Sequence, residues 1–169
     1  MLVKSYAAAV QGISATVITI EVNCTKGIQF FLVGLPDVAV RESHERIISA
    51  LQVSGYKFPR NRIVINMAPA DIRKEGSSYD LPLAIGILAA AEELDASRLG
   101  HYMMMGELSL DGSLKPVKGI LPIAIKAREE GFKGFIVPKQ NAREAAVVND
   151  LDVYGVSTIK EVIEFIAGR

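Results

Sequence analysis

The stretch "RKEGSSYDLPLAIGILAAA", Arg73 to Ala91, decides the fold. A glycine and two serines lead into a segment that is apolar nearly all round. A helix without a polar face has to be covered on every side, so we expect one that runs through the centre of the domain. Pro82 is compatible with its first turn, because the N–H that proline lacks has no intrahelical partner there.

The residues before this helix read as strands and one further helix. Alternating apolar residues predict strands over 17–23, 28–34 and 62–69. The first two are separated by a turn at 24–27 and are expected to form a hairpin. A helix is predicted over 35–56, with Gly55 ending it.

The residues after it alternate between strand and helix. Two strands are expected within 102–117, joined at Asp111-Gly112, which is a strong hairpin signal. Helices then follow at 119–131, 140–148 and 158–168, with strands at 132–138 and 151–156. This rhythm predicts parallel pairing. The fold class is mixed α/β, with a hairpin-rich N-terminal half and a βαβ C-terminal half around the central helix.

The length, composition and net charge of the chain limit its domain count, its partners and its location. The 169 residues are 50% hydrophobic, which suits one domain, and 19 Lys plus Arg balance 19 Asp plus Glu. A net charge of zero argues against attraction of the whole surface to nucleic acid or to an anionic membrane, and leaves a local patch open. No secretory signal is recognisable, and the longest apolar run, 81–91, is too short to span a bilayer. A cytoplasmic location is expected.

The serines at the helix entrance have three physical uses. Ser77 or Ser78 can cap the helix by accepting an N–H bond, and Asp80 suits the positive end of the helix dipole. Anion binding is a second use, but "GSSYD" is not a phosphate-binding loop. Nucleophilic catalysis is the third, and it requires a histidine or a neutral lysine as base. Spacing alone favours the cap.

Other reactive residue types point to structure. His44 shares a helical face with Val40 and Ile47, which predicts a partly buried structural histidine. His101 has no ligand spacing with His44 or with the single cysteine, so no metal site is expected. The three methionines at 103–105 are interpreted as core filling.

Positive charge gathers between residues 57 and 74. Five Lys or Arg against Asp71 alone leave a local net charge of plus four, five minus one. The segment is either a solvated loop face or a contact for a phosphate backbone or a partner. The pattern favours the solvated face, because Tyr56 and Phe58 are the only aromatic residues beside the charges. The nucleic-acid candidates are Lys57, Arg60, Arg62, Arg73 and Lys74.

Four segments together resemble a known family: "FFLVGLPDVAVRESHERIISAL", "SGYKFPRNRIVINMAPADIRKEG", "YDLPLAIGIL" and "GELSLDGSLKPVKG". They look like the N-terminal domain of the ComM/YifB proteins, magnesium-chelatase-like AAA+ ATPases that are also described as ATP-dependent proteases. The resemblance covers nearly the whole chain. It implies a single Lon-like domain over 1–169, with the AAA+ motor and a C-terminal chelatase-like domain absent from this sequence.

The proteolytic domain of Lon is similar more distantly. Lys74 to Asp80 lies over Lon's Lys-Asp-Gly-Pro-Ser-Ala-Gly, which puts Ser78 on the nucleophile position. Met105-Gly106-Glu107 matches Lon's Thr-Gly-Glu hairpin, and Leu121 replaces the catalytic lysine. A leucine cannot accept a proton, so the resemblance disfavours catalysis by Ser78. Tyr79 and Asp80 replace Lon's Ala-Gly and are expected to crowd the substrate cleft.

Two functional hypotheses follow. The leading one is a non-catalytic accessory domain, a pseudo-protease, of a ring-forming and hexameric motor, in a family whose ComM members are implicated in DNA branch migration. It would aid ring assembly or substrate engagement. Its expected partners are its own AAA+ domain, neighbouring subunits and DNA as a candidate, with no membrane.

No cofactor is expected in this domain, and ATP and Mg²⁺ belong to the motor. The alternative function is an ATP-dependent serine peptidase in which Ser78 attacks and Lys118 or Lys126 serves as base. A third and weaker reading, a stand-alone phosphate-binding enzyme, lacks the glycine-rich loop.

Overall fold

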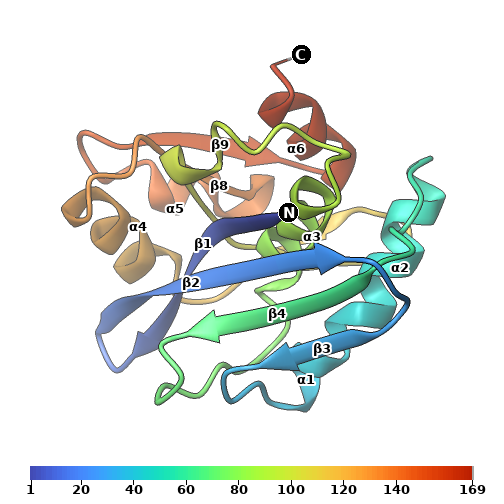
Figure 1. The fold of residues 1–169 in the computed structure, drawn as a ribbon. Helices are drawn as coiled ribbons and strands as arrows, with labels where there is room; N and C mark the ends of the chain where they lie inside the picture. Colours follow the sequence, from blue (N-terminus) through green and yellow to red (C-terminus); the bar gives the residue numbers. More distant parts are fainter. Residues whose placement is uncertain (169) are drawn as a thin grey trace.

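A long hairpin opens the fold in the computed structural model, which describes residues 1–168 (Figure 1). β1 (Leu2–Gln11) pairs antiparallel with β2 (Ser14–Thr25) along its whole length. β4 (Arg62–Ala68) pairs antiparallel with β2, and the short β3 (Phe30–Val33) pairs parallel with β4. The sheet order is therefore β1-β2-β4-β3.

The hairpin predicted between residues 17–23 and 28–34 is wrong, because β4 lies between β2 and β3. Parallel strands need a crossover, and the helical segment between β3 and β4 supplies one. The true hairpin partner of β2 is β1. Its alanine-rich stretch, Ala7 to Ala9, is buried throughout and shows no alternation that would mark a strand.

The helix predicted before β4 is two helices. α1 (Val38–Arg41) begins after Asp37, whose Oδ1 accepts the N–H of Val40 at 2.8 Å. α2 (Ser43–Val53) follows at once. Gly55 comes after its end with φ +89°, a left-handed conformation that favours glycine, as predicted.

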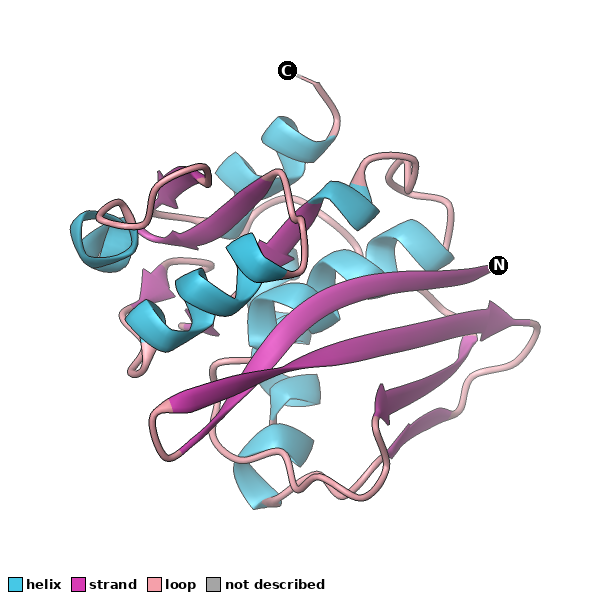
Figure 2. Cartoon of the chain, turned by 90° about the vertical axis from the view of Figure 1, so that its left-hand side faces the viewer, coloured by secondary structure: helices cyan, strands magenta, loops and turns pink. Residues whose placement is uncertain are grey.

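The central helix is confirmed. α3 (Asp80–Ala90) is buried at every residue and packs against β1 and β2. Figure 2 shows the helices gathered on one side of the long hairpin. A Cβ on Gly86 would lie 3.0 Å from a methyl carbon of Val22, so this glycine allows α3 to approach β2 closely. Among residues 1–168, the longest apolar helices remain too short to cross a membrane.

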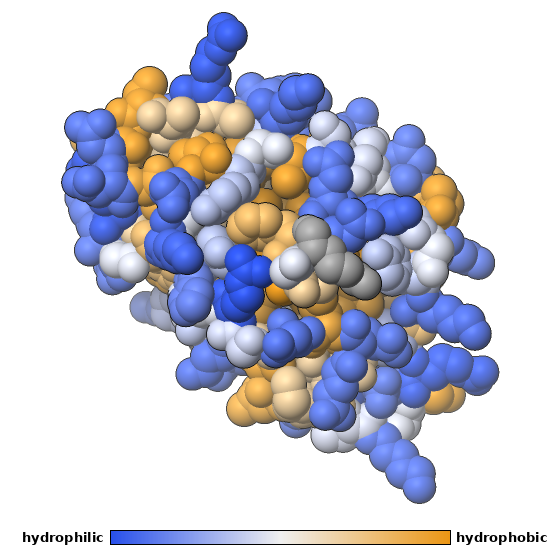
Figure 3. All heavy atoms as spheres, turned by 90° about the horizontal axis from the view of Figure 1, so that it is seen from above, coloured by the Kyte–Doolittle hydropathy of each residue, from blue (hydrophilic) through white to orange (hydrophobic). Residues whose placement is uncertain are grey.

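The second half confirms the predicted parallel pairing. The parallel sheet has the order β5-β8-β9 and consists of β5 (Tyr102–Met104), β8 (Gly134–Pro138) and β9 (Asp152–Val156). Its connecting and closing helices are α4 (Ile120–Glu129), α5 (Ala142–Ala145) and α6 (Ile159–Ile166). Figure 3 looks onto the side of the C-terminus, where hydrophobic patches show between hydrophilic side chains.

The predicted turn at Asp111-Gly112 joins a two-stranded hairpin of β6 (Glu107–Leu108) and β7 (Leu114–Lys115). The strand expected across Met105 is broken, since β5 and β6 belong to different sheets. All three methionines at 103–105 are buried, so the interpretation as core filling is confirmed.

Candidate functional site

An open cleft of about 760 Å³ lies at the entrance to α3. The end of β1 forms one wall, and the segment after β7 forms another. Ser77, Ser78, Glu107 and Lys118 are among the polar residues that line it. The structure therefore brings Ser78 and one of its two candidate bases to the same cleft.

Ser78 does not cap α3, and Ser77 does not either. The N-cap position belongs to Tyr79, and no side chain caps the helix. The N–H of Asp80 donates to the C=O of Ser77 at 3.2 Å, and that of Leu81 to the C=O of Gly106 at 3.1 Å. The capping prediction is wrong because backbone carbonyls already take the donors that a serine would satisfy.

The hydrogen bonds of the first backbone N–H groups of α3 also argue against an anion at this helix end. The third helical residue is a proline and has no N–H, and the N–H of the fourth, Leu83, donates to Tyr79. An anion at a helix start binds through free N–H groups. The first four residues of α3 offer none to a phosphate.

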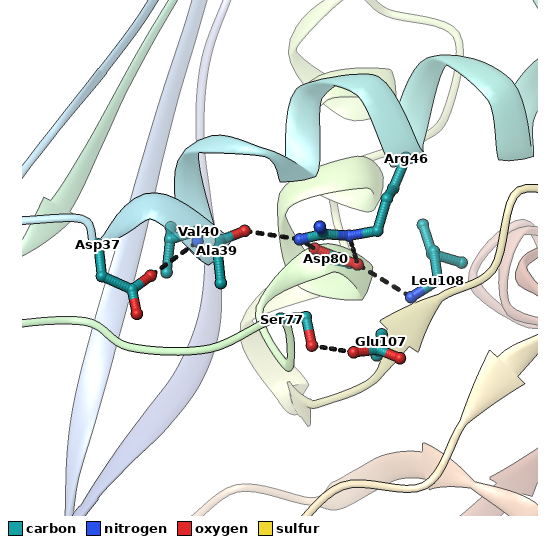
Figure 4. A network of polar contacts seen from close by, with 8 residues as sticks. All are labelled: Asp37, Ala39, Val40, Arg46, Ser77, Asp80, Glu107 and Leu108. Carbon is teal, nitrogen blue, oxygen red and sulfur yellow. Dashed lines mark hydrogen bonds and ion pairs between the residues drawn. The ribbon is translucent and has the colours of Figure 1, made fainter.

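The two serines have different surroundings. Ser77 Oγ donates to Glu107 Oε1 across the cleft, as Figure 4 shows. Ser78 is half-buried and its C=O accepts the N–H of Gly106 at 2.8 Å. Within the described part of the chain, Ser78 Oγ has no hydrogen-bond partner. A serine nucleophile needs a base within hydrogen-bond reach, and Ser78 has none in this arrangement.

Beside the cleft, Asp80 forms a buried ion pair with Arg46 (Figure 4). Arg46 Nε donates to Asp80 Oδ2 at 2.7 Å and Nη2 to Oδ1 at 2.9 Å, a two-point contact. The N–H of Leu108 donates to the same carboxylate at 3.0 Å. The pair therefore joins α2, α3 and β6. Asp80 turns away from the cleft, so the expectation that its charge crowds the cleft is wrong.

Burial sets the electrostatics of this region. It raises the pKa of Asp80 above its ordinary value, against the opposing hydrogen bonds from Arg46 and Leu108. The bond to Asp80 raises the pKa of Arg46, so the guanidinium stays charged. Burial also raises the pKa of Tyr79 to about 12.

The other catalytic candidates lie elsewhere. Leu121, on the position of Lon's lysine, is 37% exposed in the first turn of α4 and does not line the cleft. Its N–H donates to Glu144 at 3.2 Å. Lys126 pairs with Glu130 at 3.1 Å and lines a different hollow beside Phe132. Of the two proposed bases, the structure places only Lys118 in the cleft of Ser78.

Lys74 is buried instead of exposed. Its Nζ donates to the C=O of Gly34 at 2.7 Å and to the C=O of Pro69. Burial lowers the pKa of this amine. Its backbone C=O accepts the N–H of Asp37 at 2.9 Å. Lys74 thus fixes the loop before α3 to the segment after β3, and the prediction that it is a nucleic-acid contact is wrong.

The five predicted basic residues do not form one patch. Arg62 begins β4, whereas Arg73 and Lys74 follow its other end, about 20 Å away for a strand of this length. Arg73 is exposed and pairs with Glu75 at 3.3 Å. Lys57 and Arg60 are exposed on the side of Arg62.

His44 has the partly buried, structural position that the sequence predicts. His44 is half-buried and stacks on Phe30, with ring centroids 3.8 Å apart, and burial lowers its pKa. His101 is exposed. Residues 1–168 contain no group of three or more His, Cys, Asp or Glu side chains placed to hold a metal ion.

Sequence reasoning missed two contacts at the site, that of Ser77 with Glu107 and that of Asp80 with Arg46. A signal for the second was present. Asp80 is the one charged residue in an otherwise apolar helix, and a buried carboxylate requires a cationic partner. The sequence did not identify which arginine supplies it.

The central helix, the serine-bearing entrance and the acid-bearing hairpin define a mixed α/β domain similar to the proteolytic domain of Lon. Residues 20–141 match the family described as "Subunit ChlI of Mg-chelatase". Because this match covers more than half of the chain, the chain belongs to that family.

Three relatives place the chain more finely. It is 44% identical over 165 residues to competence protein ComM of Haemophilus influenzae, which covers 97% of this chain and 32% of that protein. It is 41% identical over 162 residues to the uncharacterized protein YifB of Escherichia coli, and the match covers 95% of this chain and 32% of YifB. Lon protease 2 of Bacillus subtilis is 31% identical over 125 residues, and the match covers 72% of this chain and 22% of that protease. The chain spans about a third of the length of the first two relatives.

Proposed function

We propose that this chain is a non-catalytic accessory domain of a magnesium-chelatase-like AAA+ ATPase, which aids ring assembly or substrate engagement by a longer protein. The observation that carries the proposal is the position of Leu121. It occupies the place of Lon's lysine, and its side chain stands outside the cleft that contains Ser78. The cleft therefore contains a serine at the position of Lon's nucleophile, and the residue at the position of Lon's base lies outside it.

The remaining lysines do not replace that base. A lysine accepts a proton only when burial or neighbouring charge leaves its amine neutral. Lys118 lines the cleft but is exposed, so water reaches its amine. Lys74 is buried but does not line the cleft, and two backbone carbonyls hold its amine.

The motor belongs to the longer protein in this proposal. The ComM and YifB relatives are about three times as long as the stretch they share with this chain. We place the ATP, the Mg²⁺ and the hexameric ring contacts in that additional length. The domain's partners are then its own motor and the neighbouring subunits.

Hydrolysis of unstructured protein tests the proposal. Purified chain is incubated with fluorescein-labelled casein and with a fluorogenic peptide mixture, beside a Ser78→Ala variant. We expect equal background rates for both proteins. Turnover by the wild type that the variant lacks would overturn the non-catalytic assignment.

One observation favours the alternative function, a serine peptidase. Ser78 and Lys118 line the same cleft, so a movement of the segment after β7 can bring the amine toward the hydroxyl. In that case Lys118→Ala abolishes turnover as completely as Ser78→Ala, whereas Lys126→Ala has no effect. Loss of activity in Ser78→Ala alone would point to a different base.

A further inference from the structure

An unpaired strand edge forms one wall of the cleft that contains Ser78. β1 is the outermost strand of its sheet, and β2 is its pairing partner. Residues 8–11 of β1 line the cleft, whose volume of about 760 Å³ lies within the range of about 300–1,000 Å³ typical of ligand sites. The N-terminal sheet therefore ends inside a cleft that is large enough for a ligand.

The turn between β1 and β2 determines which backbone groups face the cleft. Gln11 and Ser14 lie opposite each other, and the two residues between them form the turn, with Gly12 at φ +66°. A two-residue turn closes on a hydrogen-bonded pair, and such pairs alternate with non-hydrogen-bonded pairs along an antiparallel ladder. Gln11 therefore directs its N–H and C=O toward β2, whereas Ala8 and Val10 direct theirs toward the open edge.

These edge groups lack partners, and those of Ala8 do so in a buried position. Ala8 is 1% exposed. The backbone hydrogen bonds that join separate segments of residues 1–168 include none with the N–H or C=O of Ala8 or Val10. Buried backbone groups in native proteins are nearly always paired with protein or water. The edge therefore offers donors and acceptors for a further strand.

The other walls of the cleft are held in place by side chains. Asn141 Oδ1 accepts the N–H of Val117 at 2.9 Å, and Asn141 Nδ2 donates to the C=O of Val117 at 2.9 Å. Asp37 Oδ2 accepts the N–H of Gly76 at 3.0 Å. These bonds fix the segment after β7 and the loop before α3, and both segments leave the edge of β1 open to the cleft.

The charges of the cleft do not select an ionic ligand. Arg73 pairs with Glu75 at 3.3 Å, and Glu107 accepts a hydrogen bond from Ser77. Lys118 is exposed to water. Cations and carboxylates are thus interleaved around the cleft, so the backbone edge of β1 is its most specific feature.

We propose that this cleft binds an extended segment of polypeptide, which adds to the edge of β1 as a further strand and is not cleaved. Main-chain hydrogen bonds supply the affinity in this mode of recognition, which makes it tolerant of sequence. A folded protein fits less well, because its backbone groups are already paired. The inference rests on the proposed accessory role and names unfolded polypeptide as the substrate, but it needs no chemistry at Ser78.

Fluorescence anisotropy of a fluorescein-labelled, unstructured casein peptide tests the proposal. The edge variant is Ala8→Pro, since proline lacks the N–H that faces the cleft and leaves the pairing with β2 intact. Val10→Pro is a second edge variant at an exposed position, and it serves if Ala8→Pro does not fold. Leu2→Pro is the matched control, because the backbone of Leu2 also faces away from β2 but lies outside the cleft.

Each edge variant should bind the peptide about tenfold more weakly, because it loses one backbone hydrogen bond and gains bulk at the edge. Leu2→Pro and Ser78→Ala should bind like the wild type. The same peptide with every amide N-methylated should bind at least about tenfold more weakly, since it has no N–H to donate to the edge. Circular dichroism melting confirms that each variant is folded.

Three results would overturn the inference: no binding of the peptide, equal affinity in a folded edge variant and in Leu2→Pro, or equal affinity for the N-methylated peptide. Mass spectrometry of the peptide after the titration separates this inference from the proposed function, and an intact peptide is expected. Cleavage that Ser78→Ala lacks would refute the non-catalytic assignment. Absence of both binding and cleavage would refute the peptide contact alone.

Discussion

Replacing Arg46 by methionine tests whether the buried ion pair ties the entrance of α3 to its neighbours. The Asp80 side chain is 1% exposed and that of Arg46 is 21% exposed, so the carboxylate would lose its charged partner without gaining water. Breaking a buried pair from one side costs about 3–5 kcal/mol. The partial exposure of Arg46 favours the lower end, about 3 kcal/mol.

The cost should depend on pH. Burial already raises the pKa of Asp80, and loss of the guanidinium raises it further. Between the unfolded value of about 3.9 and the raised folded value, the folded state binds more protons than the unfolded state. Stability of the variant therefore falls as pH rises through that window. Arg46→Met should be less damaging at pH 5 than at pH 8.

Urea denaturation followed by far-ultraviolet circular dichroism provides the assay, because the chain contains no tryptophan. Adding Asp80→Asn to Arg46→Met removes the stranded charge, so the double variant should be more stable at pH 8 than Arg46→Met alone. A loss below about 1 kcal/mol at pH 8, or a loss that is the same at both pH values, would refute the reasoning.

Other outcomes follow from buried groups. Burial raises the pKa of Tyr79 to about 12. Folding therefore favours the neutral phenol, which contributes at most about 3 kcal/mol to the free energy of unfolding. This contribution is fully present below pH 10 and is lost as pH rises through 12. Tyr79→Phe should flatten that part of the stability curve, and equal alkaline losses in both proteins would contradict this. Lys74→Met leaves two backbone carbonyls without their donor and should lower the free energy of unfolding by about 2 kcal/mol, seen as a lower urea midpoint. An unchanged midpoint would argue against the anchoring role of Lys74. Gly86→Ala should cost about 1–3 kcal/mol through contact with Val22, and less in a Val22→Ala background; strictly additive effects would count against the close approach.

The parts of the fold that the sequence predicts are those fixed by local pattern. The all-apolar composition of α3 requires burial, and alternation in β2 and β4 places Ile20 and Ile65 in the core. Strand order is different, since it depends on contacts between distant residues. β2 and β3 follow each other along the chain, yet the crossover through α1 and α2 brings β4 between them.

The candidate site shows the same division. The loop that carries Ser78 could be found from its motif, as could the apolar helix after it. The acceptor of Ser77 is 30 residues away in the sequence and the partner of Asp80 is 34 residues away. A local sequence pattern therefore predicts neither pairing. Runs of charge are equally ambiguous, because β4 separates Arg62 from Lys74 and burial removes Lys74 from the surface.

The most direct test of the non-catalytic assignment is the intact mass of the purified chain after exposure to a serine-reactive phosphonate, with Ser78→Ala beside it. Such probes modify a serine only when a base activates its hydroxyl. With Leu121 outside the cleft and Ser78 Oγ lacking a described hydrogen-bond partner, we predict that both proteins keep their unmodified mass. A single adduct on the wild type that is absent from Ser78→Ala would contradict the account and establish Ser78 as an activated nucleophile.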